Sequence, residues 1–190
     1  MATYKVGYLI GSLARESINR RLAKALVQLA PESLSFTEIS FKDLPLYSYD
    51  YDADFPPAAR EFKDAIKAVD AILFVTPEYN RSIPGGLKNA IDWASRPYGT
   101  NSFTHKPSAV IGASPGSIGT AVAQQSLRSV LSFCNSPQMN APEAYIHFTP
   151  GLITEAGEVT VESTEQFLRH YMAEFHDFIA RVTSVLPKEA

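Results

Sequence analysis

Short apolar segments alternate with amphipathic segments along the whole chain. Apolar runs predict strands at residues 4–10, 34–40, 71–76, 108–113 and 145–148. Apolar side chains at helical spacing predict helices at residues 18–30, 58–68, 85–95, 118–134 and 164–186. The run at 71–76 is apolar until its last residue, which is typical of a strand buried on both faces of a parallel sheet. Five strands that alternate with five helices predict an α/β fold.

The number of strands also favours one topology. Two doubly wound strand orders are common, the dinucleotide-binding order and the five-stranded flavodoxin-like order 2-1-3-4-5. Five strands favour the second, a three-layer sandwich with a parallel sheet and helices on both faces. In either order, ligands bind at the carboxyl ends of the strands, near the switch point. We therefore expect functional residues in the loops that follow residues 10, 76 and 113.

Composition narrows the class of protein. The chain has 190 residues, of which 45% are hydrophobic and 19% charged, so we expect a single globular domain over residues 1–190. The net charge of −3 argues against a duplex nucleic-acid partner, which would require a basic surface. No apolar run approaches the ~20 residues of a membrane span, and the first residues lack the pattern of a signal peptide. We expect a cytoplasmic protein with no membrane partner.

The single cysteine and the four histidines add little chemistry. Cys134 allows no internal disulfide and lies in an apolar helical stretch, so we expect a small buried hydrophobe rather than a nucleophile. The histidines have no spacing typical of a metal site, and no metal is expected. They stand at positions 105, 147, 170 and 176.

The first of the three loops is rich in hydrogen-bond donors. Ser12, Arg15, Ser17 and Asn19 lie within eight residues, between the first strand and the first helix. A helix N-terminus offers free N–H groups and a favourable dipole to an anion. The loop contains neither G-x-G-x-x-G nor G-x-x-x-x-G-K-[ST], which favours a terminal monophosphate over a dinucleotide or a nucleoside triphosphate. The alternative is that Ser17 only caps the helix and Arg15 is solvated.

The second loop presents an aromatic ring and an amide at the sheet edge. It runs from residue 76 to 89 and is stiffened by Pro77 and Pro84. Tyr79, Asn80 and the backbone N–H groups would suit a flat heteroaromatic ligand, which needs a surface to stack on and a few donors. The alternative is a plain helix entry with Tyr79 on the rim.

The third loop contains G-x-S-x-G between a strand and a helix, the context of a hydrolase nucleophile elbow. In that elbow the residue after the serine donates its N–H to the oxyanion hole, but here it is Pro115, which has none. The required order of serine, acid and histidine is met only formally, by Glu143 followed by His147, His170 or His176. We favour a loop of small residues that lets the backbone approach a ligand closely.

The three loops together resemble the NADPH-dependent FMN reductase family, of flavodoxin-like fold, whose relatives include bacterial quinone, azo-dye and chromate reductases. Residues 11–19 followed by Leu22 and Ala23 are similar to the FMN-phosphate loop of that family. Residues 76–85 resemble its flavin-ring loop, and residues 114–119 its third flavin-facing loop. The resemblance implies that Ser12, Arg15, Ser17 and Asn19 hold the phosphate, that Pro77, Glu78, Tyr79 and Asn80 contact the ring and its chain, and that Ser114 and Gly116 border the ring. Ser117 departs from the glycine that many relatives carry.

The resemblance also implies an activity. NADPH or NADH would pass a hydride to FMN, and a small-molecule acceptor would then take the electrons by a ping-pong mechanism. Candidate acceptors are a quinone, an azo compound, a free flavin or a metal oxyanion. The flavin supplies the chemistry, so no catalytic residue is assigned. A homodimer or homotetramer is expected, with Arg128 and Tyr98 as possible contacts. The alternative is a flavodoxin-type electron carrier without a nicotinamide site.

Overall fold

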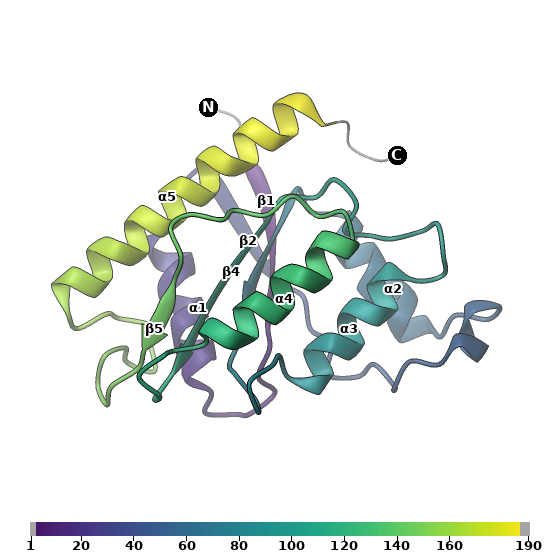
Figure 1. The fold of residues 1–190 in the computed structure, drawn as a ribbon. Helices are drawn as coiled ribbons and strands as arrows, with labels where there is room; N and C mark the ends of the chain where they lie inside the picture. The colour runs from purple at the N-terminus through teal and green to yellow at the C-terminus, as the bar shows by residue number, and fades with distance from the viewer. Residues whose placement is uncertain (1–2, 187–190) are drawn as a thin grey trace.

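The computed structural model describes residues 3–186 and contains one parallel sheet. Its strand order is β2-β1-β3-β4-β5, which confirms the predicted flavodoxin-like topology. The order reverses between β1 and β3, so the switch point lies where the first two loops leave the sheet. The strands are β1 (Tyr4–Ile10), β2 (Leu34–Glu38), β3 (Ala71–Val75), β4 (Ser108–Ser114) and β5 (Tyr145–His147) (Figure 1).

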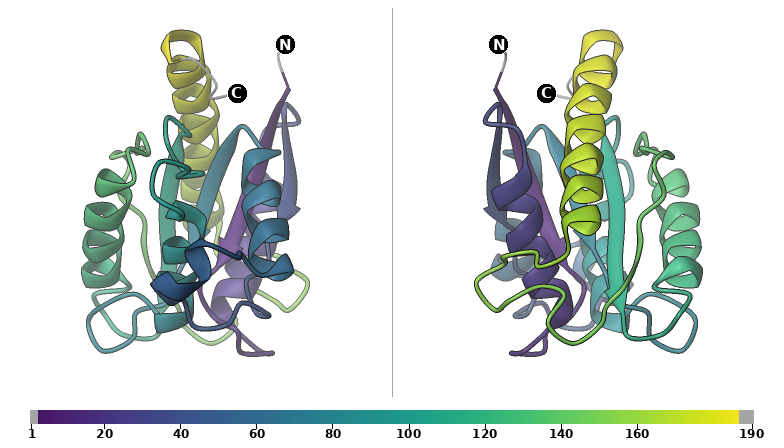
Figure 2. Two further views of the ribbon diagram at one scale, coloured as in Figure 1. Left: turned by 90° about the vertical axis from the view of Figure 1, so that its right-hand side faces the viewer. Right: turned by 90° about the vertical axis from the view of Figure 1, so that its left-hand side faces the viewer.

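Helices cover both faces of the sheet. On one face lie α1 (Ile18–Leu29) and α5 (Glu162–Val185), which pack against each other. On the other lie α2 (Pro57–Lys67), α3 (Gly85–Ser95) and α4 (Ala121–Phe133). The two layers are seen on either side of the strands in Figure 2. Within residues 3–186, no helix is long and apolar enough to cross a bilayer.

Each face of the sheet has its own hydrophobic core. The first contains Leu22 and Leu26 of α1 with Tyr171 and Phe175 of α5, all fully buried. The second joins apolar side chains of α2, α3 and α4. All five residues of β3 are buried, because this strand lies in the middle of the sheet between two helical layers. The continuous apolar run in the sequence has this physical cause.

Two local features differ from the sequence expectations. Helix α4 begins at Ala121 rather than at residue 118, because residues 118–120 form a turn in which Gly119 has a φ of +59°. The segment between β2 and α2 contains a 3-10 helix, η1 (Tyr49–Asp52), that periodicity could not reveal in four residues. This segment is held to α3 by a hydrogen bond of 2.7 Å from Trp93 Nε1 to the oxygen of Pro45.

The structure confirms Cys134 as a buried core residue. It is 3% exposed, and burial raises the pKa of its thiol, so little thiolate is present at neutral pH. We expect a thiol reagent such as Ellman's reagent to react with the native protein far more slowly than with a free cysteine at about pH 8. Full labelling should follow unfolding in guanidinium chloride. Rapid labelling of the native protein would contradict this burial.

Candidate functional site

The loops after β1, β3 and β4 meet at the carboxyl edge of the sheet, at the lower side of Figure 1. The loops lie very close to one another at Gly11 and Gly112, which both pack against Thr76. A Cβ on Gly11 would lie 2.7 Å from Thr76 Oγ1, and one on Gly112 would lie 2.0 Å from the backbone oxygen of Thr76. Thr76, at the start of the second loop, is therefore enclosed between the ends of β1 and β4. Only glycine permits this packing, which brings the three predicted loops together.

The first loop leaves several donors without partners. Ser17 occupies the N-cap position of α1, but its side chain makes no capping hydrogen bond. Ser12 and Ser17 are buried. Arg15 is exposed and makes no hydrogen bond or ion pair within residues 3–186. The N-terminus of α1 thus combines helix N–H groups, an uncommitted hydroxyl and a free guanidinium. Groups of these kinds commonly bind phosphate in proteins.

Asn19 has a partner that the sequence could not reveal. Its Nδ2 donates to the oxygen of Ala113 and its Oδ1 accepts from the nitrogen of Ala113, each at 2.9 Å. The residue is 1% exposed. These bonds join the first turn of α1 to the end of β4. Asn19, expected among the phosphate donors, therefore uses its Oδ1 and one hydrogen of its Nδ2 to hold the first loop against the third.

The second loop forms a tight turn at the rim of the site. Tyr79 N donates to Ser82 O at 2.9 Å, and Ser82 N donates to Tyr79 O at 3.0 Å. Asn80 and Arg81 both have positive φ, 50° and 64°, as in a type I′ turn. The turn leaves Tyr79 49% exposed and Asn80 exposed beside it. Pro77, just before it, is partly buried against the first loop at Gly11.

The carboxylate of Glu78 lies away from the solvent and is fully engaged. One oxygen, Oε2, accepts from Val122 N at 3.0 Å and from Ala123 N at 3.1 Å. The other, Oε1, accepts from Arg81 Nη1 at 3.0 Å. The side chain is only 9% exposed. It therefore links the second loop to the first turn of α4.

The third loop has no hydrolase geometry. Ser114 Oγ accepts a hydrogen bond of 3.1 Å from Gly116 N, and in the part of the chain that the structure describes no hydrogen bond joins it to a histidine, although His147 is its partner in the β4–β5 register. His147 Nε2 lies 3.2 Å from the oxygen of Pro115 instead. The nucleophile–base contact and an N–H at Pro115 are both missing. Pro115, Gly116 and Ser117 are exposed, so their backbone is accessible to a ligand.

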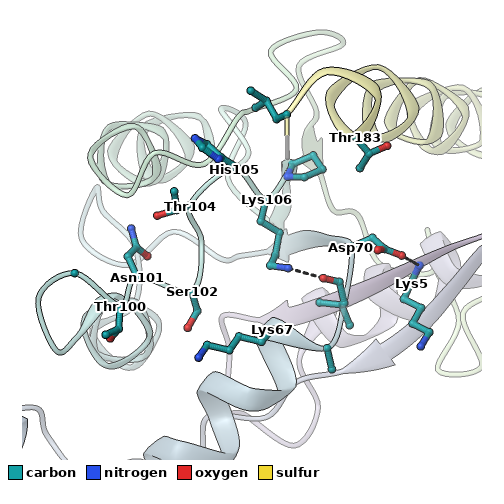
Figure 3. Close-up of a pocket in the computed structure, with 15 residues that line it drawn as sticks. Lys5, Lys67, Asp70, Thr100, Asn101, Ser102, Thr104, His105, Lys106 and Thr183 are labelled. Atoms are coloured by element: carbon teal, nitrogen blue, oxygen red, sulfur yellow. Dashed lines mark hydrogen bonds between the residues drawn. The ribbon is translucent and has the colours of Figure 1, made fainter. Parts of the chain in front are cut away.

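A sizeable hollow lies at the other edge of the sheet. A cavity of about 670 Å³ opens at the amino ends of the strands, where Figure 3 shows Lys5, Lys67 and Lys106 in its wall with Thr183 of α5. Lys106 Nζ donates to the oxygen of Val69, which fixes one side of this wall. Size alone would place a ligand there. The donors and the switch point lie at the opposite edge, so we assign the candidate site to the three loops. No group of three or more potential metal ligands occurs within residues 3–186.

Comparison with known proteins identifies the family of this chain. The sequence profile of the NADPH-dependent FMN reductase family matches residues 4–151. A 2-hydroxy-1,4-benzoquinone reductase of Burkholderia sp is 48% identical over 171 residues, which cover 90% of this chain and 93% of the relative. A quinone reductase of Pseudomonas putida is 45% identical over 177 residues, covering 93% of this chain and 95% of the relative.

A solved structure gives the same result at the level of the fold. The flavoenzyme NAD(P)H:(acceptor) oxidoreductase FerB of Paracoccus denitrificans superimposes with a TM-score of 0.90 at 45% sequence identity. The match covers 94% of this chain and 98% of that structure. With the profile spanning most of the chain and relatives aligned over nearly their full lengths, this protein belongs to the NADPH-dependent FMN reductase family.

Proposed function

We propose that this NAD(P)H-dependent oxidoreductase binds FMN across the three loops and reduces a small acceptor, with a quinone as the first class to test. The observation that carries the proposal is the set of uncommitted donors at the N-terminus of α1. Ser17 does not cap the helix, and Arg15 has no partner within residues 3–186, although both stand beside a helix dipole that attracts an anion. A phosphate would satisfy these groups.

The phosphate end of FMN would be held by the first loop. Ser12 and Ser17 would donate their hydroxyls, and Arg15 would supply the charge-assisted contact. Asn19 was expected among these ligands, and we now assign its amide to the support of the loop, because it is bonded to Ala113. The remaining members of the phosphate site stay as predicted.

The ring would lie over the second and third loops. Pro77, Tyr79 and Asn80 would border it from one side and Ser114 and Gly116 from the other, with Glu78 contributing through its backbone. When bound, the flavin supplies the capacity to accept a hydride and to release electrons to a second substrate. The backbone N–H groups near Tyr79 and Asn80 would stabilise negative charge on the ring. No side chain of this chain is assigned as a general acid or base.

The rim of the site is open, and this supports alternate use of one surface. Tyr79 is about half exposed, and no loop covers it within residues 3–186. We propose that nicotinamide and acceptor bind there in turn, which gives ping-pong kinetics. The relatives named as quinone reductases support a quinone acceptor, while azo compounds, free flavin and metal oxyanions are further candidates. A cytoplasmic homodimer or homotetramer completes the proposal.

The visible spectrum of the purified protein tests the cofactor and the activity class together. After incubation with FMN and removal of excess ligand, the protein should show a bound-flavin spectrum that bleaches on addition of NADPH or NADH. Adding a quinone should restore the oxidised spectrum. A flavin that binds but is not reduced by either nicotinamide would favour the electron-carrier alternative. Absence of any bound flavin would contradict the proposed function.

For the kinetic mechanism, initial rates measured over a grid of nicotinamide and quinone concentrations should give parallel double-reciprocal lines. Intersecting lines would indicate that both substrates bind at once. That result would overturn the ping-pong proposal and leave the cofactor assignment intact.

A further inference from the structure

We infer that Glu78 is a positioning residue, which fixes the second loop to the N-terminus of α4 and so sets the distance between the two loops that border the ring. The inference rests on the proposed function, because it concerns how the ring site is shaped. It separates Glu78 from its neighbours Tyr79 and Asn80, which are exposed at the rim. The Glu78 side chain is instead buried, and its carboxylate points toward the N-terminus of α4.

The contacts of Glu78 are those of a helix cap contributed from a distant segment. A single oxygen accepts from two successive N–H groups, Val122 N at 3.0 Å and Ala123 N at 3.1 Å. These residues occupy the first turn of α4, where N–H groups have no partner within the helix. A carboxylate at this end of a helix is also favoured by the helix dipole. The bonds therefore stabilise both α4 and the second loop.

The local cap of α4 is missing, which makes the distant one necessary. Thr120 occupies the N-cap position, but its side chain makes no capping hydrogen bond. Its hydroxyl instead accepts from Gln124 Nε2 at 2.9 Å. Removal of the Glu78 carboxylate would thus leave the first turn of α4 without any side-chain acceptor. The third loop leads directly into this turn, and we expect its position relative to the second loop to change.

The third loop is anchored at both ends by side chains from the other two loops. At the β4 end, Ala113 is bonded to Asn19 of the first loop. At the α4 end, Val122 and Ala123 are bonded to Glu78 of the second loop. The six residues from 114 to 119 lie between these anchors. The gap that receives the ring is therefore fixed by two cross-links rather than by the loops individually.

Glu78 both caps α4 and pairs with Arg81, and variants at positions 78 and 81 can separate these two functions. Arg81 pairs with Oε1, the oxygen that does not cap α4, and its own side chain is 68% exposed. A glutamine at position 78 keeps an oxygen that can accept from Val122 N and Ala123 N but removes the charge that attracts Arg81. An alanine at position 81 removes only that pair. The two variants should therefore behave alike.

The experiment compares E78A, E78Q, E78D and R81A in the full chain, with FMN and riboflavin affinities measured by flavin fluorescence. We expect E78A to weaken the binding of both flavins by about ten-fold. A lost helix cap changes an equilibrium constant by about that factor, and we expect the flavin-bound protein to require the capped arrangement of the loops. The ratio of FMN to riboflavin affinity should not change, because the phosphate loop is untouched. E78Q and R81A should stay within about three-fold of the wild type. E78D keeps the charge on a side chain one methylene shorter, and it should lose several-fold.

A second readout separates positioning from catalysis. If the carboxylate only positions the loops, E78Q should keep the pH profile of quinone reduction between about pH 6 and 8. The inference would be overturned if E78Q lost as much flavin affinity as E78A, or if its pH profile lost one limb. Either result would show that the carboxylate itself touches the reacting groups. Wild-type flavin affinity in E78A or E78D would overturn the inference as well. If E78A does not fold, E78Q and E78D still decide between these outcomes.

The matched control is E165A. Glu165 also pairs with an arginine, Arg169 at 2.7 Å, but on the outer side of α5 and without capping a helix. The E165A variant should therefore bind both flavins with wild-type affinity. Failure of the wild type to bind any flavin would defeat the proposed function, whereas normal binding by the wild type and by E78A would defeat the inference alone.

Discussion

Replacement of Arg15 by alanine should weaken FMN binding by roughly ten- to a hundred-fold, because a charge-assisted hydrogen bond contributes about 1.5–3 kcal/mol. Riboflavin, which lacks the phosphate, should bind almost as well to the variant as to the wild type. The guanidinium is exposed and has no hydrogen bond or ion pair within residues 3–186, so its loss should cost little stability. Titration of both flavins against each protein measures the effect.

Two further variants control for charge. R15K keeps the positive charge but loses the fork of donors, so we expect an intermediate loss of FMN affinity. R21A removes a nearby arginine, in the helix α1 that follows the loop of Arg15. Arg21 pairs with Glu155 at 3.4 Å, and R21A should bind FMN like the wild type. Equal losses of FMN and riboflavin in R15A would show that Arg15 does not contact the phosphate. A similar loss in R21A would point to general electrostatics instead.

The fold could be predicted, and the candidate site could be placed on three loops, because both rest on short-range patterns. Strands and helices were identified by their apolar spacing, and their number selected the strand order that the structure confirms. Once the strands are parallel, the three loops must lie at one edge. The glycines at positions 11 and 112 then permit the close contact with Thr76. No long-range information was required for this level of description.

The side-chain partners inside the site depend on long-range contacts that one sequence does not contain. Glu78 finds its amide donors 44 and 45 residues away, and Asn19 finds Ala113 94 residues away. The polar composition of the first loop placed Asn19 among the phosphate donors, and the family resemblance placed Glu78 among the residues that contact the ring and its chain. The structure shows that each side chain bonds to backbone of a neighbouring loop.

A buried charge on α2 illustrates the same limit. The helical pattern predicts the apolar stripe of this helix but not the environment of Lys63, whose Nζ donates to the oxygens of Ala94 and Thr100 at 2.9 and 2.8 Å. Burial lowers the pKa of Lys63 to about 8. These carbonyls lie at and beyond the end of α3, so the lysine satisfies backbone groups that the sequence cannot place beside it. Tertiary contact rather than local pattern decides its role.

Replacement of Asn19 by alanine should be among the most damaging single changes to this protein. The variant would leave both the N–H and the carbonyl of Ala113 without partners, and Ala113 is fully buried. Each orphaned buried group costs about 1–3 kcal/mol, so we expect the free energy of unfolding to fall by about 2–5 kcal/mol. Denaturant unfolding followed by circular dichroism, without flavin and with saturating FMN, measures the loss.

N89A is the matched control, because Asn89 makes the same pair of backbone bonds in a different place. It accepts from Tyr47 N at 2.8 Å and donates to Pro45 O at 2.9 Å. Those groups lie near the surface, where water can replace the side chain, so N89A should lose only about 1 kcal/mol. N19A should also weaken FMN and riboflavin together, since Asn19 joins the first loop to the third, whereas N89A should leave both affinities unchanged. A wild-type unfolding midpoint in N19A would show that the Asn19 bridge does not stabilise the fold, and equal midpoints for the two variants would show that it contributes no more than the Asn89 bonds. Selective loss of FMN in N19A would return its amide to the phosphate site.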